Sequence, residues 1–237
     1  MKRRNPTFHF ADQTTRYWYD GNPFVTLFFN GMSTCFPAGE LLFVQSISFF
    51  RDKIKDPQLL EAMAIFTFQE ARHRKMHHEY NLQMEALGYP FIRLEAFMYR
   101  FIASTRIYSD LSRLTLTVCY EHLTTIMCET LLNNPKMVNA MASPFREAWI
   151  YHAIEELEHK AVAFDVYRAV GGGYFRRFFL MLLSTFVLFL EVSYPLIVCL
   201  HKDRILFSPS TWVQGFRFLF LTPGFLLRLV PGYLRFF

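Results

Sequence analysis

Cysteine is scarce in this chain, and its scarcity excludes two classes of protein. The four cysteines form no Cys-x-x-Cys pair and lack the density of a disulfide scaffold. We therefore expect four small core thiols in a reducing compartment: Cys35, Cys119, Cys128 and Cys199. Stretches that alternate polar and apolar residues, as half-buried strands do, are also absent. The sequence therefore predicts an all-α fold.

The amino terminus lacks the uninterrupted apolar run of a secretory signal. Residues 1–6 are basic but lead into a mixed aromatic and polar stretch, so we expect no signal peptide and a cytoplasmic protein. The chain also lacks a basic polar stripe. Its net charge is +5, but the basic residues late in the chain alternate with apolar runs, which argues against nucleic acid as a partner and favours a membrane surface.

Apolar residues, in contrast, are abundant. They make up 52% of the 237 residues, enough for one substantial core, and the 28 phenylalanines become dense after Gly173. We therefore expect residues 1–172 to form one domain and residues 173–237 to form a hydrophobic, helical C-terminal extension.

Turn and capping signals divide the first part of the chain into four expected helices. An irregular lead-in occupies residues 1 to about 24, and residues 91–109 form a connector with some helical character. Pro37 either begins the first helix or kinks it, and the sequence leaves both open. Asp56 and Asp110 are the expected caps of the second and third helices. The expected helices are 24–50, 57–87, 110–132 and 144–170.

Two Glu-x-x-His pairs are the most informative motif. They are Glu70 with His73 and Glu156 with His159. Residues three apart share one face of a helix, so each pair can direct a carboxylate and an imidazole at one point. An isolated glutamate precedes each pair by about one helix length. Two such helices, each facing a helix with one more glutamate, form the dinuclear metal site of ferritin-like four-helix bundles.

Three more residues complete the predicted ligand set. Glu40 precedes the first pair and Glu121 the second, and both are expected as terminal ligands, with the glutamates of the pairs as bridges. His152 lies one turn before Glu156, on the face that carries Glu156 and His159, and makes the site richer in nitrogen.

The donor atoms predict the metal and the number of ions. Carboxylates and imidazoles suit iron and manganese, whereas thiolates would indicate zinc or an iron–sulfur cluster. Four buried glutamates would be costly as bare anions, and two divalent cations neutralise them. We therefore expect two iron ions, with manganese as the alternative metal.

Nearby ionisable residues are weaker candidates for a role in the site. His77 lies on the ligand face one turn beyond His73, and Asp165 follows the last pair. Each is a candidate to hydrogen-bond a ligand, and His77 is also a candidate alternative ligand. Glu155 and Glu158 flank the ligand face and are expected to be solvated or paired with cations.

The segments around these ligands resemble a known family. Residues 36–40, 69–73, 120–122 and 149–165 are similar to the bacterial family known as predicted metal-dependent hydrolases, and the resemblance covers about residues 22–174. The order of the ligands is similar to that of the di-iron arylamine N-oxygenases of the p-aminobenzoate N-oxygenase type. That second resemblance implies a di-iron centre that activates O₂.

These patterns leave three functional hypotheses. The first is an oxygenase or oxidase that uses O₂ on a small apolar or aromatic substrate, including an amine, with an external electron donor. The second is a hydrolase that uses a water activated by the two metals. The third is an iron-binding or redox-sensing bundle without a substrate.

The tail raises the question of location. Residues 178–200 contain one charge, Glu191, and could cross a bilayer core of about 30 Å. Residues 211–237 combine arginines with aromatic residues, as interfacial segments do. We expect residues 174–237 to attach the protein to the inner face of the cell membrane, with docking on the bundle or a homodimer interface as alternatives.

Overall fold

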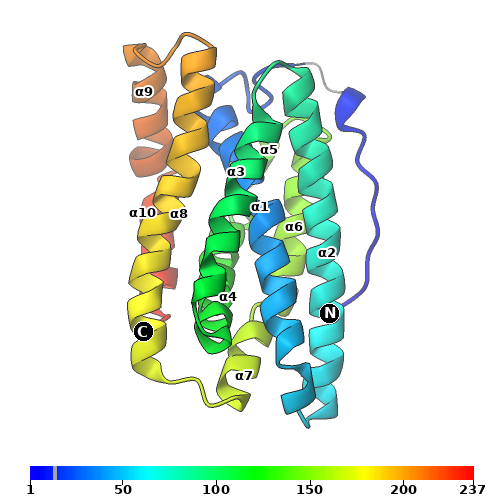
Figure 1. Ribbon diagram of the computed structural model, residues 1–237. Coiled ribbons are helices and arrows are strands. Elements are labelled where there is room, and N and C mark those ends of the chain that lie inside the picture. Colours follow the sequence, from blue (N-terminus) through cyan, green and yellow to red (C-terminus); the bar gives the residue numbers. More distant parts are fainter. Residues whose placement is uncertain (13–14) are drawn as a thin grey trace.

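Helices make up most of the described molecule. The structure is a computed structural model that describes residues 1–12 and 15–237, and it contains no strand in those residues (Figure 1). The predicted all-α class is confirmed. Residues 13 and 14, in the expected irregular lead-in, lie outside the described residues.

Four helices enclose the centre of the molecule. They are α1 (Pro23–Phe49), α2 (Pro57–Ala86), α4 (Asp110–Leu132) and α6 (Phe145–His159). α1 packs on α2 and α4, and α6 packs on the same two helices, so the four form a closed bundle. A ferritin-like relationship of this bundle stays a prediction.

Side-chain caps account for the starts of three of the four bundle helices. Asn22 and Asp56 accept hydrogen bonds from backbone amides of the first turn, and a proline follows each at the first helical position. Ser109 caps α4, whereas we expected Asp110, which is instead the first residue of that helix. Pro37 lies inside α1, so the first helix does not begin there.

Two segments differ from the sequence prediction. The fourth helix is not continuous to residue 170, because it ends at His159 and resumes as α7 (Val162–Ala169). After this break, apolar side chains of α7 such as Val166 and Tyr167 are buried in the core. The connector contains a 14-residue helix, α3 (Phe91–Ser104), and a short turn, η3 (Thr105–Ile107). α3 packs across α1 and α2.

The C-terminal part lies along one side of the bundle (Figure 1). α8 (Tyr174–Lys202) packs on α1 and α4, and it is followed by α9 (Pro209–Phe216), the π-helical turn η4 (Arg217–Leu221) and α10 (Phe225–Leu234). Gly31 of α1 permits the close approach of α8, because a Cβ there would lie 3.2 Å from the backbone oxygen of Val192.

This part also contributes to the interior. Met181 and Phe236 belong to one core cluster, and Leu200, Phe218 and Phe225 belong to the other. The division of the chain at residue 173 into bundle and extension stays a prediction.

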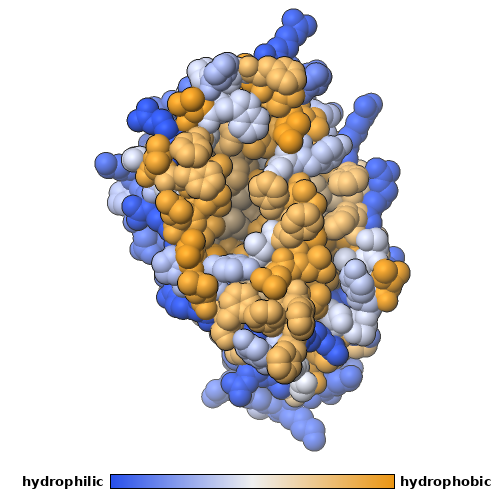
Figure 2. All heavy atoms as spheres, turned by 90° about the vertical axis from the view of Figure 1, so that its left-hand side faces the viewer, coloured by the Kyte–Doolittle hydropathy of each residue, from blue (hydrophilic) through white to orange (hydrophobic). Residues whose placement is uncertain are grey.

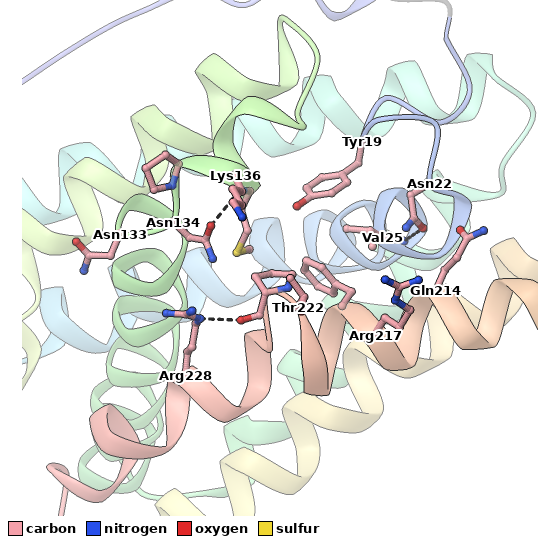
Figure 3. A pocket seen from close by; sticks show the side chains of 14 residues that line it. Tyr19, Asn22, Val25, Asn133, Asn134, Lys136, Gln214, Arg217, Thr222 and Arg228 are labelled. Atoms are coloured by element: carbon pink, nitrogen blue, oxygen red, sulfur yellow. Dashed lines mark hydrogen bonds between the residues drawn. The ribbon is translucent and has the colours of Figure 1, made fainter.

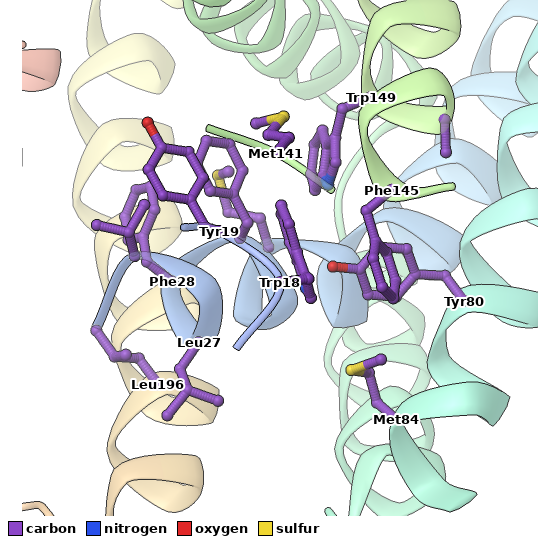
Figure 4. Packing of buried hydrophobic residues seen from close by; sticks show 14 of the residues in the cluster. Trp18, Tyr19, Leu27, Phe28, Tyr80, Met84, Met141, Phe145, Trp149 and Leu196 are labelled. Carbon is purple, nitrogen blue, oxygen red and sulfur yellow. The ribbon is translucent and has the colours of Figure 1, made fainter. Parts of the chain in front are cut away.

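An aromatic cluster fixes the lead-in to the bundle (Figure 4). The Trp18 ring stacks on Phe145 with centroids 4.8 Å apart, and its indole N–H donates to Asn30 Oδ1 at 2.8 Å. Tyr80 packs against the other side of this group, on Phe145. The lead-in is therefore anchored beside the four helices that carry the predicted ligands.

Within the described residues, three segments are long and apolar enough to cross a membrane: Pro23–Lys53, Tyr174–Lys202 and Pro209–Leu234. The first is mostly inside the protein, whereas the other two are mostly exposed. The apolar character of α1 is therefore explained by the core, and that of the C-terminal helices is not.

Candidate metal centre

The fold brings all seven predicted ligands into the interior of the four-helix bundle. Each is at most 2% exposed. α1 carries Glu40, α4 carries Glu121, α2 carries one Glu-x-x-His pair, and α6 carries the other together with His152. The helical periodicity that suggested these residues therefore places them on inward faces.

Glu156 lies at the centre of the cluster. Its Oε1 is 3.4 Å from His152 Nε2, 3.5 Å from His159 Nε2 and 3.7 Å from His73 Nδ1. His159 Nδ1 is in turn 3.3 Å from Glu70 Oε1. One carboxylate thus approaches three imidazoles.

Donor atoms gather in two overlapping groups. In the first, one donor from each of Glu70, His73, Glu156 and His159 lies within 4.8 Å of the others. In the second, the same is true of Glu40, His73 and His152. Glu121 is buried on α4 but belongs to neither group. The two groups share His73, so six of the seven predicted ligands direct donor atoms into one buried region.

Many of these donor atoms have no hydrogen-bond partner in the described part of the chain. Both carboxylate oxygens of Glu40, Glu70 and Glu121 are buried without one, as are His73 Nδ1 and His152 Nε2. An unsatisfied buried polar atom costs about 1–3 kcal/mol, and more for a charged group. Such a concentration of orphaned lone pairs fits metal ions as their partners.

Burial also shifts the acid–base equilibria of these groups. It raises the pKa of the Glu40, Glu70 and Glu121 carboxyls well above the ordinary value, and neighbouring carboxylates raise each further. Burial lowers the pKa of His152 to about 3, so its imidazole is neutral at pH 7, the form that binds a metal. Divalent cations would compensate the buried carboxylates in their ionised form.

A buried carboxylate fixes the tautomer of His73. Glu155 Oε2 lies 3.1 Å from His73 Nε2, and Arg4 pairs with the same glutamate at 3.2 Å. An ionised carboxylate only accepts hydrogen bonds, so His73 Nε2 carries the proton and Nδ1 presents a lone pair to the cluster. Glu155 and Glu158 were expected to be solvated or paired with cations. Both pair with Arg4, and Glu155 is also fully buried.

A chain of polar side chains, which we call the polar relay, runs from α3 to the site. It consists of Glu95, Asn81, Ser33 and His77. Asn81 Nδ2 donates to Glu95 Oε2 at 2.9 Å and to the Ser33 backbone oxygen at 3.1 Å, which orients the amide. The Ser33 hydroxyl donates to Asn81 Oδ1 at 2.9 Å. At the outer end, Glu95 Oε1 accepts from His78 Nδ1 at 2.8 Å.

The polar relay determines which nitrogen of His152 presents a lone pair to the cluster. Since the hydroxyl proton of Ser33 is committed to Asn81, its oxygen accepts from His77 Nδ1 at 3.0 Å. Neutral His77 then accepts through Nε2, 3.1 Å from His152 Nδ1. His152 Nδ1 therefore carries a proton and Nε2 is left with a lone pair toward Glu156.

The two residues suggested as supports of the ligands lie in different places. His77 is buried against His152, as described above. Asp165 is exposed on α7, beyond the break at residues 160–161, so it does not take the predicted place beside a buried imidazole. Glu155 occupies that position beside His73. Its role depends on Arg4 of the lead-in, a contact that no spacing rule reveals.

A small apolar cavity touches the site. It has a volume of about 20 Å³ and extends from Phe225 of α10 to Phe36 and Thr124. The Phe36 ring stacks on His152 with centroids 5.0 Å apart. Thr124 donates to Glu156 Oε2 at 2.9 Å. Two residues that line this cavity thus contact two of the predicted ligands, His152 and Glu156.

A family model described as "Predicted metal-dependent hydrolase" matches residues 2–237, almost the whole chain. The comparisons with curated proteins and with solved structures found no match. The similarity to arylamine N-oxygenases therefore stays a prediction. The match covers both the helices that carry the cluster and the C-terminal helices, so the chain belongs to the family of predicted metal-dependent hydrolases.

Proposed function

We propose that the cluster binds two divalent metal ions, with iron as the working metal and manganese as the alternative. The orphaned donor atoms support this proposal most strongly, because a protein without metals would leave at least three buried carboxylates unpaired. All donors are carboxylate or imidazole, which suits iron and manganese. The exclusively helical scaffold fits a carboxylate-bridged dinuclear site.

The two donor groups suggest how the ions are shared. Glu70 and His159 would hold one ion, and Glu40 and His152 the other. Glu156 would bridge them, because its Oε1 approaches an imidazole from each set. Glu121 would be a terminal ligand, drawn in by the charge of the ions.

We infer that the chemistry is oxidation of a small apolar or aromatic substrate by O₂. Two ferrous ions would supply the electrons that reduce O₂, and an external donor would restore them. The observation that carries this choice is the apolar lining of the small cavity at Phe36 and Thr124. Its volume of about 20 Å³ suits an apolar gas such as O₂, and a larger substrate would enter only if side chains moved.

The protein's own residues would orient the ligand side chains and exclude water from the site. The polar relay and Glu155 keep two imidazoles in the tautomers that face the ions. The Thr124 hydroxyl orients Glu156 by hydrogen bonding to Oε2. The aromatic rings of Phe36 and Trp149 line the small cavity and exclude water from it.

Hydrolysis is the second candidate, and the family description favours it because it names that reaction. Metal ions in this site could supply an activated water. A hydrolase also has to admit water and a polar scissile group, whereas the cavity is lined by apolar side chains with one hydroxyl. That is our reason to place oxidation first. The third candidate, iron binding without a substrate, predicts metal uptake without turnover.

One set of measurements separates these candidates. The protein is loaded anaerobically with Fe²⁺, its metal content is measured, and O₂ consumption and ester or amide cleavage are followed. Two irons per chain with rapid O₂ consumption support the oxidase. A zinc-loaded protein that is inert to O₂ but cleaves esters or amides supports the hydrolase.

A pair of matched variants links the result to the cluster. Glu156→Ala removes the central carboxylate and should abolish stoichiometric metal binding. Glu158→Ala, two residues along the same helix, removes a carboxylate that pairs with Arg4 outside the cluster and should leave binding unchanged. Equal metal content in both variants would contradict the assignment of the site.

A further inference from the structure

The outer surface of the C-terminal helices exposes large apolar side chains over its whole length. We call this surface the apolar face; it is formed by α8, α9, η4 and α10 and includes Phe179, Phe186, Phe189, Trp212, Phe216 and Leu234. The three phenylalanines of α8 are each more than 60% exposed. Figure 2 shows hydrophobic atoms spread over this side of the molecule around a hollow, with hydrophilic groups at its margins. Monomeric soluble proteins rarely expose an apolar area of this extent.

We propose that the apolar face attaches the protein to a membrane of anionic phospholipid, and that a basic pocket beside it binds lipid phosphate groups. The pocket is lined by Lys136, Arg217 and Arg228 among other residues. This inference does not depend on the chemistry of the metal centre.

The packing of α8 determines how the protein meets the membrane. One side of this helix, including Met181 and Leu196, is buried against the bundle, and the opposite side is open along the helix. A helix that crossed the bilayer in this arrangement would carry its bundle neighbours into the hydrocarbon. That would immerse exposed charges of α2 such as Lys75. The apolar face therefore lies in the interfacial plane and does not span the bilayer.

The net positive charge of the chain comes from the C-terminal residues that form the apolar face. Residues 173–237 contain seven Lys or Arg and two acidic residues, which accounts for the entire net charge of +5, while residues 1–172 contain 18 of each sign. Both acidic residues of the region are engaged. Glu191 is buried and accepts from the Tyr120 hydroxyl at 2.9 Å, and Asp203 pairs with Arg16. The unpaired cations complement lipid phosphates.

The basic pocket lies where the apolar face meets the bundle (Figure 3). Its volume is about 560 Å³, and it is bounded by the start of α1, the end of α4 and the turn between η4 and α10. No acidic residue lines it. None of the salt bridges in the described residues involves Lys136, Arg217 or Arg228. Arg228 Nε donates to the Pro223 backbone oxygen at 2.7 Å, which holds its guanidinium at the rim.

Neighbouring residues connect the pocket with the apolar face. Arg217 follows Phe216, and Arg228 follows Leu227, so each arginine of η4 and α10 adjoins an exposed apolar side chain. Such neighbours suit a headgroup layer that meets both acyl chains and phosphates. A second copy of the chain is a poorer occupant, because a two-fold interface would bring two positively charged regions together.

The test is co-sedimentation of the full chain with sucrose-loaded vesicles. We expect binding to vesicles that contain phosphatidylglycerol and weak binding to phosphatidylcholine alone. The variant with Lys136, Arg217 and Arg228 all changed to Gln should bind about 100-fold more weakly. Phe186→Ser with Phe189→Ser should weaken binding to both kinds of vesicle.

A matched control removes three exposed cations elsewhere, Arg51, Lys55 and Lys75, by the same change to Gln. It should bind like the wild type. Metal content and circular dichroism check that each variant is folded. If a variant fails to fold, salt titration of the wild type decides, since attraction to phosphate must weaken as salt rises.

Several results would overturn the proposal. Equal binding to neutral and anionic vesicles, no loss in the pocket variant, or insensitivity to salt would each contradict it. A stable dimer in light scattering that dissociates when Phe186 and Phe189 are changed would assign the apolar face to a second copy instead. The metal centre can pass or fail its own test in either case.

Discussion

His77 offers the sharpest test of the site, because it acts on the metals only through another residue. His77→Phe removes the nitrogen that accepts from His152 Nδ1 at 3.1 Å while keeping a ring among Phe36 and Trp149. The N–H of His152 is then buried without a partner, since both residues are at most 1% exposed. We expect a loss of about 1–3 kcal/mol in the free energy of unfolding of the metal-free protein.

The loss of tautomer control should also weaken metal binding. Without its acceptor, the His152 imidazole can place its proton on Nε2, where the lone pair should face a metal. Removing the partner of a ligating histidine typically weakens metal affinity by about 10–100-fold. Competition with a chelator under anaerobic conditions measures this affinity, and urea unfolding of the metal-free protein measures the stability.

Two further variants separate positioning from packing. His77→Gln places an amide oxygen near the lost Nε2 and should recover most of the affinity. His201→Phe, an exposed histidine of α8, should change neither quantity. If Phe and Gln at position 77 weaken binding equally, or if neither does, the inferred direction of hydrogen bonding through the polar relay is wrong.

Three more predictions follow from the buried charges. Glu155→Leu removes the acceptor of a ligand imidazole and should lower metal affinity about tenfold, whereas Glu158→Leu should not; chelator competition distinguishes them. In the metal-free protein, the free energy of unfolding should fall as pH rises above about 5. The raised pKa values of the buried carboxyls keep protons in the folded state that the unfolded chain releases, and the slope is about 1.4 kcal/mol per pH unit for each such carboxyl. A flat profile for the metal-free protein in urea unfolding would contradict this. Glu191→Gln should stabilise the protein by about 3 kcal/mol at pH 8 and much less at pH 4.5, because burial raises the pKa of this carboxyl to about 7; equal gains at both pH values would refute that cause.

Local signals in the sequence were sufficient for the ligand-bearing helices. Proline and a capping residue mark the start of α2, and Gly88 with Pro90 marks its end, so the predicted range 57–87 differs from the observed helix by one residue. The helix predicted between a cap at Asp110 and Leu132 differs from α4 by one residue at its start and agrees at its end. Because the ligands follow helical spacing within these ranges, their common face could be predicted before any packing was known.

The break in the fourth helix could not be predicted in the same way. Lys160 and Ala161 are good helix formers, and the only strong stop signal, three glycines, comes ten residues later. The interruption therefore arises from tertiary packing. Asp165, a candidate to hydrogen-bond a ligand, follows this break and is exposed.

The residues that hydrogen-bond the predicted ligands or their partners could not be predicted from the sequence either, for a related reason. Spacing along a helix indicates which residues share a face, but not which residue of another helix lies opposite. Ser33 of α1 meets His77 of α2, and Arg4 of the lead-in reaches Glu155 of α6. These pairs are separated by 44 and 151 positions, so only the assembled bundle reveals them.

Phe225 connects the two proposals. It begins α10, whose other side belongs to the apolar face, and its own ring lines the cavity that ends at Phe36 beside His152. Phe225 is 1% exposed and the cavity has a volume of about 20 Å³, so a molecule larger than water could pass from the apolar face to Phe36 only if side chains around Phe225 moved. If both proposals hold, a Phe225→Ala variant should therefore speed the reaction of the metal-loaded protein with an apolar reagent added in vesicles, and an unchanged rate would separate the two features.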